Sequence, residues 1–513
     1  MPADPARGAG PGPLLALAVV AALATVGAWA RRTPFPLLTD EAGYLADACR
    51  PAGLASFAWG PLYAALYCAV RHVSDDPFGV FWAKQAAVTL AGGVLFYRLG
   101  LAYGLGPRLS PLAGLWYVLA LLVVNGTSEL ALLLGVAAVL CAVSGGGRGG
   151  MGFGVLMAAA SLVRPEYLVG LGAAAVLGLG RRHGRRGVAA AALAAALALA
   201  AVIAVAARSD GEGRSWFAFG QQFAVNLVEA TGAGPDPNVE WRSVVARSFP
   251  SSRSIPDAVR ENPRMVAWHL GYNVRRLPRG LANLLLPVPS FVPWPFPLRA
   301  AVAAAALWLV LVTAAAGARR TARARRPSLD PLLALATIPL VSLLFRPAAR
   351  HLEPLLPLAL VLTGAALKSE PDPAPSALRT ASRGLFGGML LLGLASPWAF
   401  WARTPPPSQA LTGWIRDLRQ DARTRPIRLL ATWYGERTCG LVGPSCRAVS
   451  IDEFRGGRDA DAALLGPDWD ARADVRSDPR LRSLPSRPED YGCTASAPPA
   501  DGFRFIRCGP SLR

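Results

Sequence analysis

Apolar runs long enough to cross a membrane recur along most of this chain and limit what it can fold into. A transmembrane helix needs about 20 mostly apolar residues. The overall hydrophobic fraction of 53% and the mean hydropathy of +0.34 also exceed what is usual for soluble domains. We therefore expect an all-α polytopic membrane protein of about 11 transmembrane helices, near residues 12–30, 79–97, 111–125, 129–143, 151–163, 166–180, 187–207, 298–317, 328–345, 352–367 and 384–402.

The positive charge of the chain indicates its orientation in the membrane. The net charge is +20, and arginines cluster between apolar runs at 181–186 and 318–326, as in cytoplasmic loops. These clusters lack interleaved aromatic residues and any recognition motif, so we expect no nucleic-acid partner. Alternation of the loops predicts a multi-pass protein of the plasma (inner) membrane with its N-terminus in the cytoplasm and its C-terminus in the periplasm or extracellular space. Residues 31–78, 208–297 and 346–351 then face outward.

The first apolar run and the segment after it also need an interpretation. The run ends in Ala-Trp-Ala, which a signal peptidase could cleave, but it is longer than a usual h-region and is followed by Arg31 and Arg32. We therefore expect a retained helix. In the outward segment 31–78, mixed apolar and polar periodicity predicts helices that lie along the membrane interface.

A second domain is predicted after the last apolar run, which divides the chain into a membrane domain at 1–402 and an extramembrane domain at 403–513. The second part is polar, and we expect a small mixed or irregular fold. It contains Cys439, Cys446, Cys493 and Cys508. An even number of cysteines in an oxidising compartment predicts two disulfides, with a zinc site as the alternative, although no Cys-x-x-Cys pair is present. We expect Cys49, Cys68 and Cys141 to be ordinary buried or interfacial residues.

Ionisable side chains at the predicted outer ends of the apolar runs are the candidate functional residues. Charged groups near hydrocarbon are unfavourable, so those that occur there usually serve a function. They come from distant parts of the sequence and could meet in one outer cavity: Asp40, Glu41, Asp75, Asp76, Lys84, Glu129, Arg164, Glu166, Arg346, Arg350 and His351. Asp75 and Asp76, in Ser-Asp-Asp-Pro, are better explained as a turn and helix cap.

Five of the segments that carry these residues resemble a known family, in order and spacing. They are LTDEAGYLADA (38–48), WGPLYAALYCAV (59–70), VFWAKQAAVTLAGGVLFYRLG (80–100), SLVRPEYLVG (161–170) and RHLEPLLPLALVL (350–362). Together they resemble the bacterial GT-C glycosyltransferases related to protein O-mannosyltransferases and to the aminoarabinose transferase of lipid A. The resemblance covers about residues 12–402 and implies a GT-C-like fold. It also implies transfer of a sugar from a polyprenyl-phosphate donor, which is a membrane lipid, to an acceptor hydroxyl at the outer face. The acceptor attacks C1 of the sugar, with inversion at that carbon.

The resemblance implies a role for each acidic candidate. Asp40 matches the catalytic aspartate of the family and would act as the general base that takes the proton from the acceptor hydroxyl. The alternative is that it caps an interfacial helix beginning at Glu41. Glu41 could orient the acceptor or contact a divalent cation, or it could be a solvated first-turn residue. Glu129 lies where the family often has a further acidic residue.

The basic candidates would bind the departing phosphate. Arg350 and His351 match a basic pair of the family that precedes a proline-rich helix, and Arg can hold phosphate oxygens with two hydrogen bonds. Lys84 is a further candidate for the phosphate, and we expect Arg164 and Glu166 to form an ion pair that shapes the cavity. Tyr44 could line the sugar or lipid site. The sequence predicts no metal site and no cofactor. A divalent cation in contact with Glu41 is the one alternative left open.

Two other functions remain open at this point. A transporter or flippase of lipid-linked sugars would use a similar donor, but it would more often show an inverted repeat or broken helices at the membrane centre. A non-catalytic component of envelope polysaccharide assembly is the other alternative. The sequence does not indicate the sugar or whether the acceptor is a protein, a lipid or a glycan. The aminoarabinose branch has Lys-Pro-Pro where this chain has Trp59-Gly60-Pro61-Leu62, which argues against an aminoarabinose donor.

Overall fold

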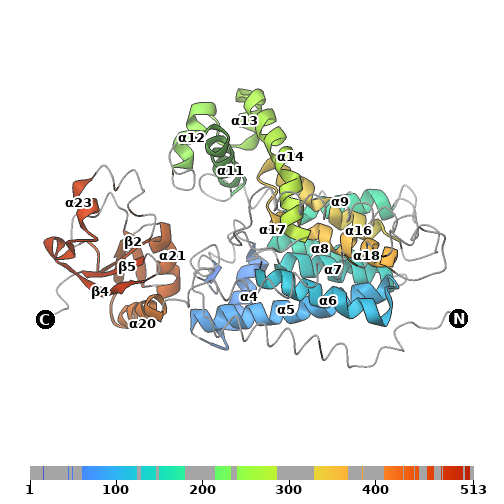
Figure 1. The fold of residues 1–513 in the computed structure, drawn as a ribbon, viewed down its shortest axis with the longest axis horizontal. Coiled ribbons are helices and arrows are strands. Elements are labelled where there is room, and N and C mark those ends of the chain that lie inside the picture. The colour runs from blue at the N-terminus through green and yellow to red at the C-terminus, as the bar shows by residue number, and fades with distance from the viewer. Residues whose placement is uncertain are drawn as a thin grey trace.

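A computed structural model gives the fold. It describes residues 16, 44, 45, 49, 60–74, 76–123, 129–145, 149–179, 214–232, 240–285, 328–367, 380, 384, 409–430, 433–443, 445–449, 454, 459–466, 469, 475, 478–500 and 503–508. The described chain is mostly helical, with one sheet near the C-terminus. Figure 1 shows three parts: a bundle of helices, a group of helices that projects from it, and the domain that holds the sheet.

The helical bundle forms the largest part and contains most of the apolar helices. α5 packs against α4, α6 and α7, and α8 packs against α4, α7 and α9, while α16 lies on α7 and α9. Figure 1 shows α4 at the end of the bundle next to the sheet domain. The bounds are α4 Pro61–Arg71, α5 Pro77–Ala102, α6 Gly106–Val123, α7 Glu129–Ser144, α8 Gly149–Val163, α9 Tyr167–Ala174, α16 Asp330–Ala336 and α18 Leu356–Leu367.

Several predicted spans correspond to helices of the bundle. The ranges 79–97, 129–143 and 151–163 fall within α5, α7 and α8. Among the described residues, α5 is the one helix whose length and apolar character together suffice to cross a membrane. The ranges 12–30, 187–207, 298–317 and 384–402 lie almost wholly outside the described residues. The total of eleven spans therefore stays a prediction.

Other predicted spans are interrupted. Over 328–345, α16 gives way to the 3-10 helix η6 (Ile338–Leu344), and 166–180 is α9 followed by the π-helix η5 (Ala175–Leu179). The range 352–367 begins inside α17 (Ala349–Leu352) and passes through the 3-10 turn η7 (Glu353–Leu355) before α18. Prolines account for two of these breaks, because Pro339 and Pro354 lack the backbone N–H that an α-helix interior requires.

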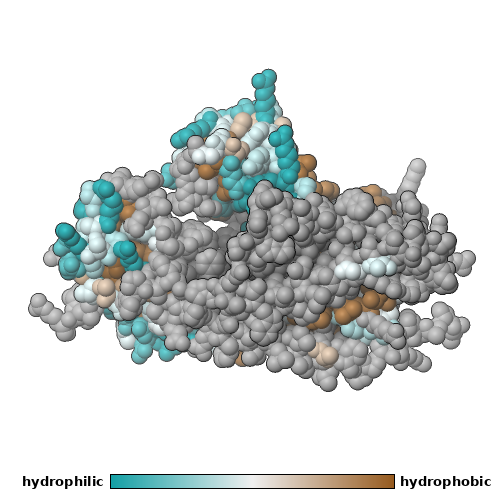
Figure 2. All heavy atoms as spheres, in the orientation of Figure 1, coloured by the Kyte–Doolittle hydropathy of each residue, from teal (hydrophilic) through white to brown (hydrophobic). Residues whose placement is uncertain are grey.

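A group of four helices fills much of the outward segment 208–297. They are α11 Arg214–Thr231, α12 Trp241–Ser248, α13 Ile255–Glu261 and α14 Pro263–Leu285. Their apolar sides enclose an aromatic core of their own that includes Trp216, Phe219, Phe223, Trp241 and Phe249. Figure 2 shows hydrophilic side chains over this group. These helices contain no long apolar run that would predict them from the sequence, because each is apolar on one side only.

The C-terminal part is a small α/β domain. Its five strands are β1 Ile427–Leu430, β2 Cys446–Val449, β3 Ala462–Leu465, β4 Cys493–Ala500 and β5 Phe503–Cys508, in the order β2-β1-β3-β5-β4. β1 is parallel to β2 and β3, and β5 is antiparallel to β3 and β4. The helices α20 (Gln409–Thr424) and α21 (Trp433–Val442) pack on this sheet. Of the two kinds of fold expected for this domain, mixed or irregular, the structure shows the mixed one. The domain boundary at 402/403 stays a prediction.

Disulfides confirm one cysteine prediction and correct another. Cys439 pairs with Cys446, and Cys493 pairs with Cys508, as expected for two disulfides in this domain, and the zinc alternative is ruled out for these four residues. Cys49 and Cys68 were expected to be ordinary residues, and this was wrong, because they form a third disulfide with Cα atoms 4.8 Å apart. Both lie in the segment predicted to face outward, where disulfides form. Cys141 is a free cysteine.

Gly60 lies where α4 meets the end of α8. Its φ of 77° is unfavourable for residues with a side chain, and a Cβ at this position would lie 2.2 Å from the carbonyl oxygen of Val163. Glycine thus lets the start of α4 touch the backbone immediately before Arg164. This contact brings two segments together that are about 100 residues apart in sequence.

We predict that Gly60→Ala destabilises the protein by at least about 3 kcal/mol, since it combines backbone strain with a clash against backbone atoms. Gly104→Ala is the matched control, because Gly104 also has a positive φ (72°) but has open space around its Cβ position. The control should lose about 1 kcal/mol. Thermal unfolding of both purified variants in detergent measures the difference, and equal losses would contradict the close contact.

Candidate functional site

The chain that follows the predicted catalytic aspartate is fastened to α4. Asp40 and Glu41 themselves lie outside the described residues, so their roles stay predictions. The Tyr44 ring meets the Tyr63 ring edge to face, with centroids 4.5 Å apart. The backbone oxygen of Leu45 accepts a hydrogen bond of 3.3 Å from Arg71. Together with the nearby disulfide, these contacts hold the chain beside α4.

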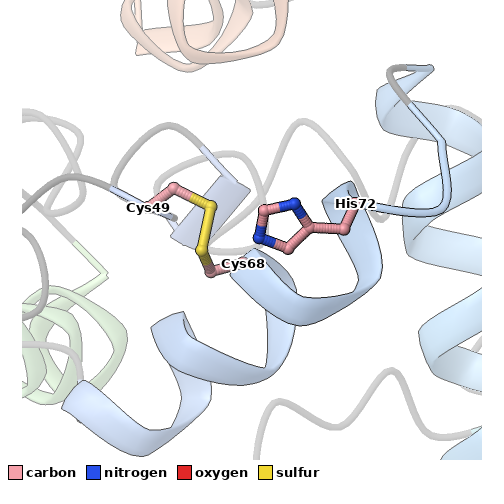
Figure 3. A group of neighbouring side chains, drawn as sticks. All are labelled: Cys49, Cys68 and His72. Atoms are coloured by element: carbon pink, nitrogen blue, oxygen red, sulfur yellow. A yellow bond between two sulfur atoms is a disulfide. The ribbon is translucent and has the colours of Figure 1, made fainter.

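Figure 3 shows the disulfide between Cys49 and Cys68, with the His72 ring beside it. Cys68 and His72 lie one helical turn apart. Candidate ligand atoms of the three residues lie within 4.8 Å of one another, and this is the one such group among the described residues. Both sulfur atoms are bonded to each other, which makes them unsuitable as thiolate ligands. The disulfide therefore acts here as a covalent link.

Lys84 is buried within the bundle, with 1% of its surface exposed. Its ammonium group donates hydrogen bonds to the Tyr63 hydroxyl at 2.9 Å and to the Gln85 side-chain oxygen at 3.2 Å. It also lies 4.9 Å from the centre of the Phe81 ring and 5.5 Å from the centres of the Tyr63 and Tyr67 rings. Aromatic faces and hydroxyl groups favour a cation at such distances. The tyrosines of α4 thus create a polar, aromatic environment for a charge on α5.

Glu129 joins the same cluster from α7. It is the first residue of that helix and is 2% exposed. The Gln85 side-chain nitrogen donates a hydrogen bond of 3.2 Å to its carboxylate. Gln85 therefore lies between a buried lysine and a buried glutamate, with its oxygen toward the first and its nitrogen toward the second. The structure brings Lys84 and Glu129 into one network, as expected if both serve one site.

Arg164 and Glu166 form the predicted ion pair, in the turn between α8 and α9. The Arg164 Nε donates a hydrogen bond of 2.7 Å to the Glu166 carboxylate. Burial tends to lower the pKa of Arg164, but Glu166, with smaller contributions from Tyr167 and Tyr44, raises it above its ordinary value. Arg164 therefore stays charged, and Tyr44 is one of its neighbours.

Arg350 and His351 lie in α17, and their ring and guanidinium nitrogens are 3.3 Å apart. The His351 Nδ1 is 2.7 Å from the backbone oxygen of Arg346, so Nδ1 carries the hydrogen and donates it. Nε2 is then free to accept the hydrogen bond from Arg350. This arrangement requires a neutral imidazole. In the structure His351 orients Arg350, and its assignment to phosphate binding stays a prediction.

The electrostatic surroundings of His351 agree with a neutral ring. It lies in the segment 346–351, outside the predicted spans. Burial lowers the pKa of His351 to about 3, with further lowering by Arg164 and Arg350 and partial opposition from the Arg346 carbonyl and Glu166. The same interactions show that the 164–166 turn and α17 are neighbours. Four of the predicted residues therefore lie in a second cluster.

Glu353 lies near residues beside both clusters, and we did not predict it from the sequence. It is 2% exposed, begins η7 and lies within electrostatic range of Tyr117 and Tyr167. Tyr117 in turn lies within range of Glu129, and Tyr167 lies within range of Arg164. A charged residue three positions after Arg350, at the start of a predicted span, was a signal that could have identified it.

The two clusters place cations and carboxylates side by side in a largely buried region. Lys84, Arg164 and Arg350 supply positive charge, and Glu129, Glu166 and Glu353 supply negative charge. Such groups interact strongly where water is excluded. An incoming phosphate could bind to the cations, and a carboxylate could accept a proton from a hydroxyl group. The described residues thus combine groups that can bind an anion with groups that can accept a proton.

A pH prediction follows from His351. Because its pKa in the folded state is below the ordinary 6.5, the unfolded chain binds a proton first as the pH falls. The stability that it contributes is present above about pH 6.5 and is lost as the pH falls toward 3. We expect wild type to lose about 2 kcal/mol more than His351→Gln between pH 7.5 and 4.5.

Thermal unfolding in detergent at the two pH values tests this prediction. His72→Gln is the matched control, because it makes the same substitution at an exposed histidine outside this cluster. Equal losses of stability in the wild type and in His351→Gln would contradict the prediction. They would show that His351 binds a proton as readily in the folded protein as in the unfolded chain.

Comparisons with known proteins find a likeness to a solved structure but no related sequence. No protein-family model matches the sequence, and no curated protein matches it significantly. Among solved structures, the chain is similar to a single-particle cryo-EM structure of arabinofuranosyltransferase AftD from Mycobacteria, with a TM-score of 0.42 and 16% sequence identity. The match covers 98% of this chain and 40% of that chain, so this chain spans less than half the length of that protein.

Proposed function

We propose that this protein is a membrane glycosyltransferase of the GT-C type. It moves a sugar from a polyprenyl-phosphate-linked donor to an acceptor hydroxyl at the outer face of the plasma membrane. Asp40 takes the proton from the acceptor, the hydroxyl oxygen attacks C1 of the sugar, and the bond from C1 to the phosphate oxygen breaks with inversion. Lys84 and Arg350 stabilise the negative charge that develops on the departing phosphate.

The observation that carries this proposal is the gathering of charged residues from distant parts of the sequence into two buried clusters. Lys84 and Glu129 belong to one cluster, and Arg164, Glu166 and Arg350, with Tyr44 beside Arg164, belong to the other. Buried cations are unfavourable unless a function or a partner requires them. A phosphate leaving group is a ligand of the opposite charge, which these cations can bind. The acidic members could position the acceptor.

The chain near Asp40 is also prepared for this role. The disulfide at Cys49 and the Tyr44–Tyr63 contact hold the following residues against α4, which carries two of the rings around Lys84. The proposed reaction requires Asp40, four residues before Tyr44, to reach the region of these cations. At its ordinary pKa of about 3.9, Asp40 is a weak base, so close placement of the acceptor must supply much of the rate enhancement.

A transporter of lipid-linked sugars is the second candidate. The breaks at η5, η6 and η7 are the feature that favours it, because transporters often bind their substrates at interrupted helices. The ionisable residues nevertheless gather around the ends of helices instead of following a path through the bundle. This distribution suits a reaction at one membrane face.

We predict that Asp40→Asn reduces sugar transfer by about 10²–10⁴-fold, since the amide cannot accept the proton of the acceptor hydroxyl. The assay measures transfer of labelled sugar from a panel of polyprenyl-phosphate sugars in membranes that contain equal amounts of each variant. Asp47→Asn is the matched control, because it makes the same chemical change in the same loop. It should transfer sugar at close to the wild-type rate.

The outcomes separate the candidate functions. Equal transfer by wild type and Asp40→Asn would remove Asp40 as the base. Movement of a donor across the membrane by wild type, with no transfer to any acceptor, would favour the transporter.

A further inference from the structure

A fully buried polar network joins the projecting helices to the loop before Arg350. Asn226 on α11 and His269 and Asn273 on α14 are each 0% exposed. Their side chains contact one another and the backbone oxygens of Leu343, Leu344 and Phe345, at the end of η6. Neither our sequence analysis nor the proposed reaction assigns these three residues a role.

The hydrogen bonds of this network fix the donors and acceptors. The Asn226 amide nitrogen donates to the His269 Nδ1 at 3.1 Å and to the Asn273 side-chain oxygen at 2.8 Å. His269 therefore carries its hydrogen on Nε2, which lies 3.2 Å from the Leu344 oxygen. The Asn273 amide nitrogen donates its two hydrogens to the oxygens of Leu343 and Phe345, each at 2.8 Å, and it also lies 3.2 Å from the His269 Nε2, to which it then donates none. The Asn226 side-chain oxygen accepts a hydrogen bond of 3.3 Å from the Arg276 guanidinium.

Three successive carbonyl groups at a helix end thus receive side-chain donors. Carbonyl groups at the C-terminal end of a helix lack partners within the helix and need them from elsewhere. Burial lowers the pKa of His269 to about 4, against the opposing effect of the Leu344 and Phe345 carbonyls, so the ring is neutral, as this bonding requires. A network with all its groups paired specifies one conformation of the loop.

The same helices hold the loop at two further points. The Glu229 carboxylate on α11 accepts a hydrogen bond of 3.2 Å from the Arg346 side chain. A Cβ at Gly280 on α14 would lie 2.1 Å from the carbonyl oxygen of Pro347, so backbone approaches backbone there. The Arg346 oxygen accepts the hydrogen bond from His351, which in turn orients Arg350. A chain of contacts therefore runs from α14 to the Arg350 guanidinium.

We infer that Asn226, His269 and Asn273 are positioning residues. They lock residues 343–349, which run from the end of η6 to the start of α17, so that Arg350 faces the phosphate of the donor. This inference rests on the proposed function for the nature of the ligand. Replacing such a network with apolar residues often leaves a protein equally stable, so its value lies in the single loop conformation that it selects. The projecting helices then serve the reaction without contacting the donor.

Asn273→Asp tests the inference, because it keeps the shape of the side chain but replaces the amide, whose two hydrogens bind the loop, with a carboxyl group that has at most one. Hydrogen exchange of the full chain in detergent should show faster exchange within 343–352 and unchanged exchange in α20. The donor KM should rise about tenfold, with a smaller change in kcat. Arg275→Gln, an exposed position on the same helix, is the control and should behave as wild type.

A double-mutant cycle with Arg350→Gln separates positioning from general stability. If the network acts through Arg350, adding Asn273→Asp to Arg350→Gln should change the donor KM by less than about twofold. Should Asn273→Asp fail to accumulate, His269→Gln replaces it, with an expected rise in KM of about threefold.

Two results would overturn the inference: exchange that rises throughout the protein or nowhere, or a full tenfold effect that persists without Arg350. The exchange measurement needs no donor. If wild type transfers no sugar from any donor, the proposed function fails, while the exchange pattern still decides whether the network holds the loop.

Discussion

Burial of the Lys84 ammonium group is the constraint to which the rest of the site responds. A charged group in an apolar helical bundle loses its hydration, which is unfavourable unless other polar or aromatic groups replace the water. Here Tyr63, Gln85 and three aromatic rings do so, from α4 and α5. Gln85 passes the interaction on to Glu129 and so draws the start of α7 into the network. One unfavourable charge therefore explains why three helices meet at this point with polar residues.

The second cluster depends on the segments that hold it from outside the bundle. Gly60 lets the start of α4 touch the backbone before Arg164, and α14 approaches the loop before Arg350 just as closely at Gly280. These contacts leave little freedom to the two turns that carry the arginines. Rigid support of this kind keeps catalytic groups in the geometry that a reaction requires. The C-terminal domain adds a contact at the start of α5, where Arg416 lies 3.5 Å from the Asp76 carboxylate.

Sequence patterns predicted the parts of the fold that depend on hydrophobicity and local chemistry. The apolar runs at 79–97, 129–143 and 151–163 are helices, Asp76 caps α5 as its Ser-Asp-Asp-Pro setting indicated, and Arg164 pairs with Glu166. A local pattern specifies such features almost completely. The interruptions at η6 and η7 were also within reach, since prolines mark them.

The remaining features depend on contacts between distant residues. The helices α11–α14 bury an aromatic core that no single stretch reveals, and Asn226 meets His269 only after α11 packs on α14. The predicted outward placement of residues 31–78 favours disulfide formation by cysteines in this segment. The sequence alone does not show that Cys49 pairs with Cys68. Glu353 gains its place near the clusters from the fold of η7. For Asp40 and Glu41, the sequence resemblance remains the basis of their assignment.

The central claim is that the cations of these clusters bind the phosphate of a polyprenyl donor. A cryo-EM structure of the full chain in a lipid nanodisc, with an added polyprenyl phosphate, measures this most directly. Our account predicts phosphate density within hydrogen-bonding distance of Lys84 or Arg350, and loss of that density in Lys84→Met. Phosphate bound at the arginine clusters of 181–186 or 318–326 instead, or bound unchanged in Lys84→Met, would contradict it.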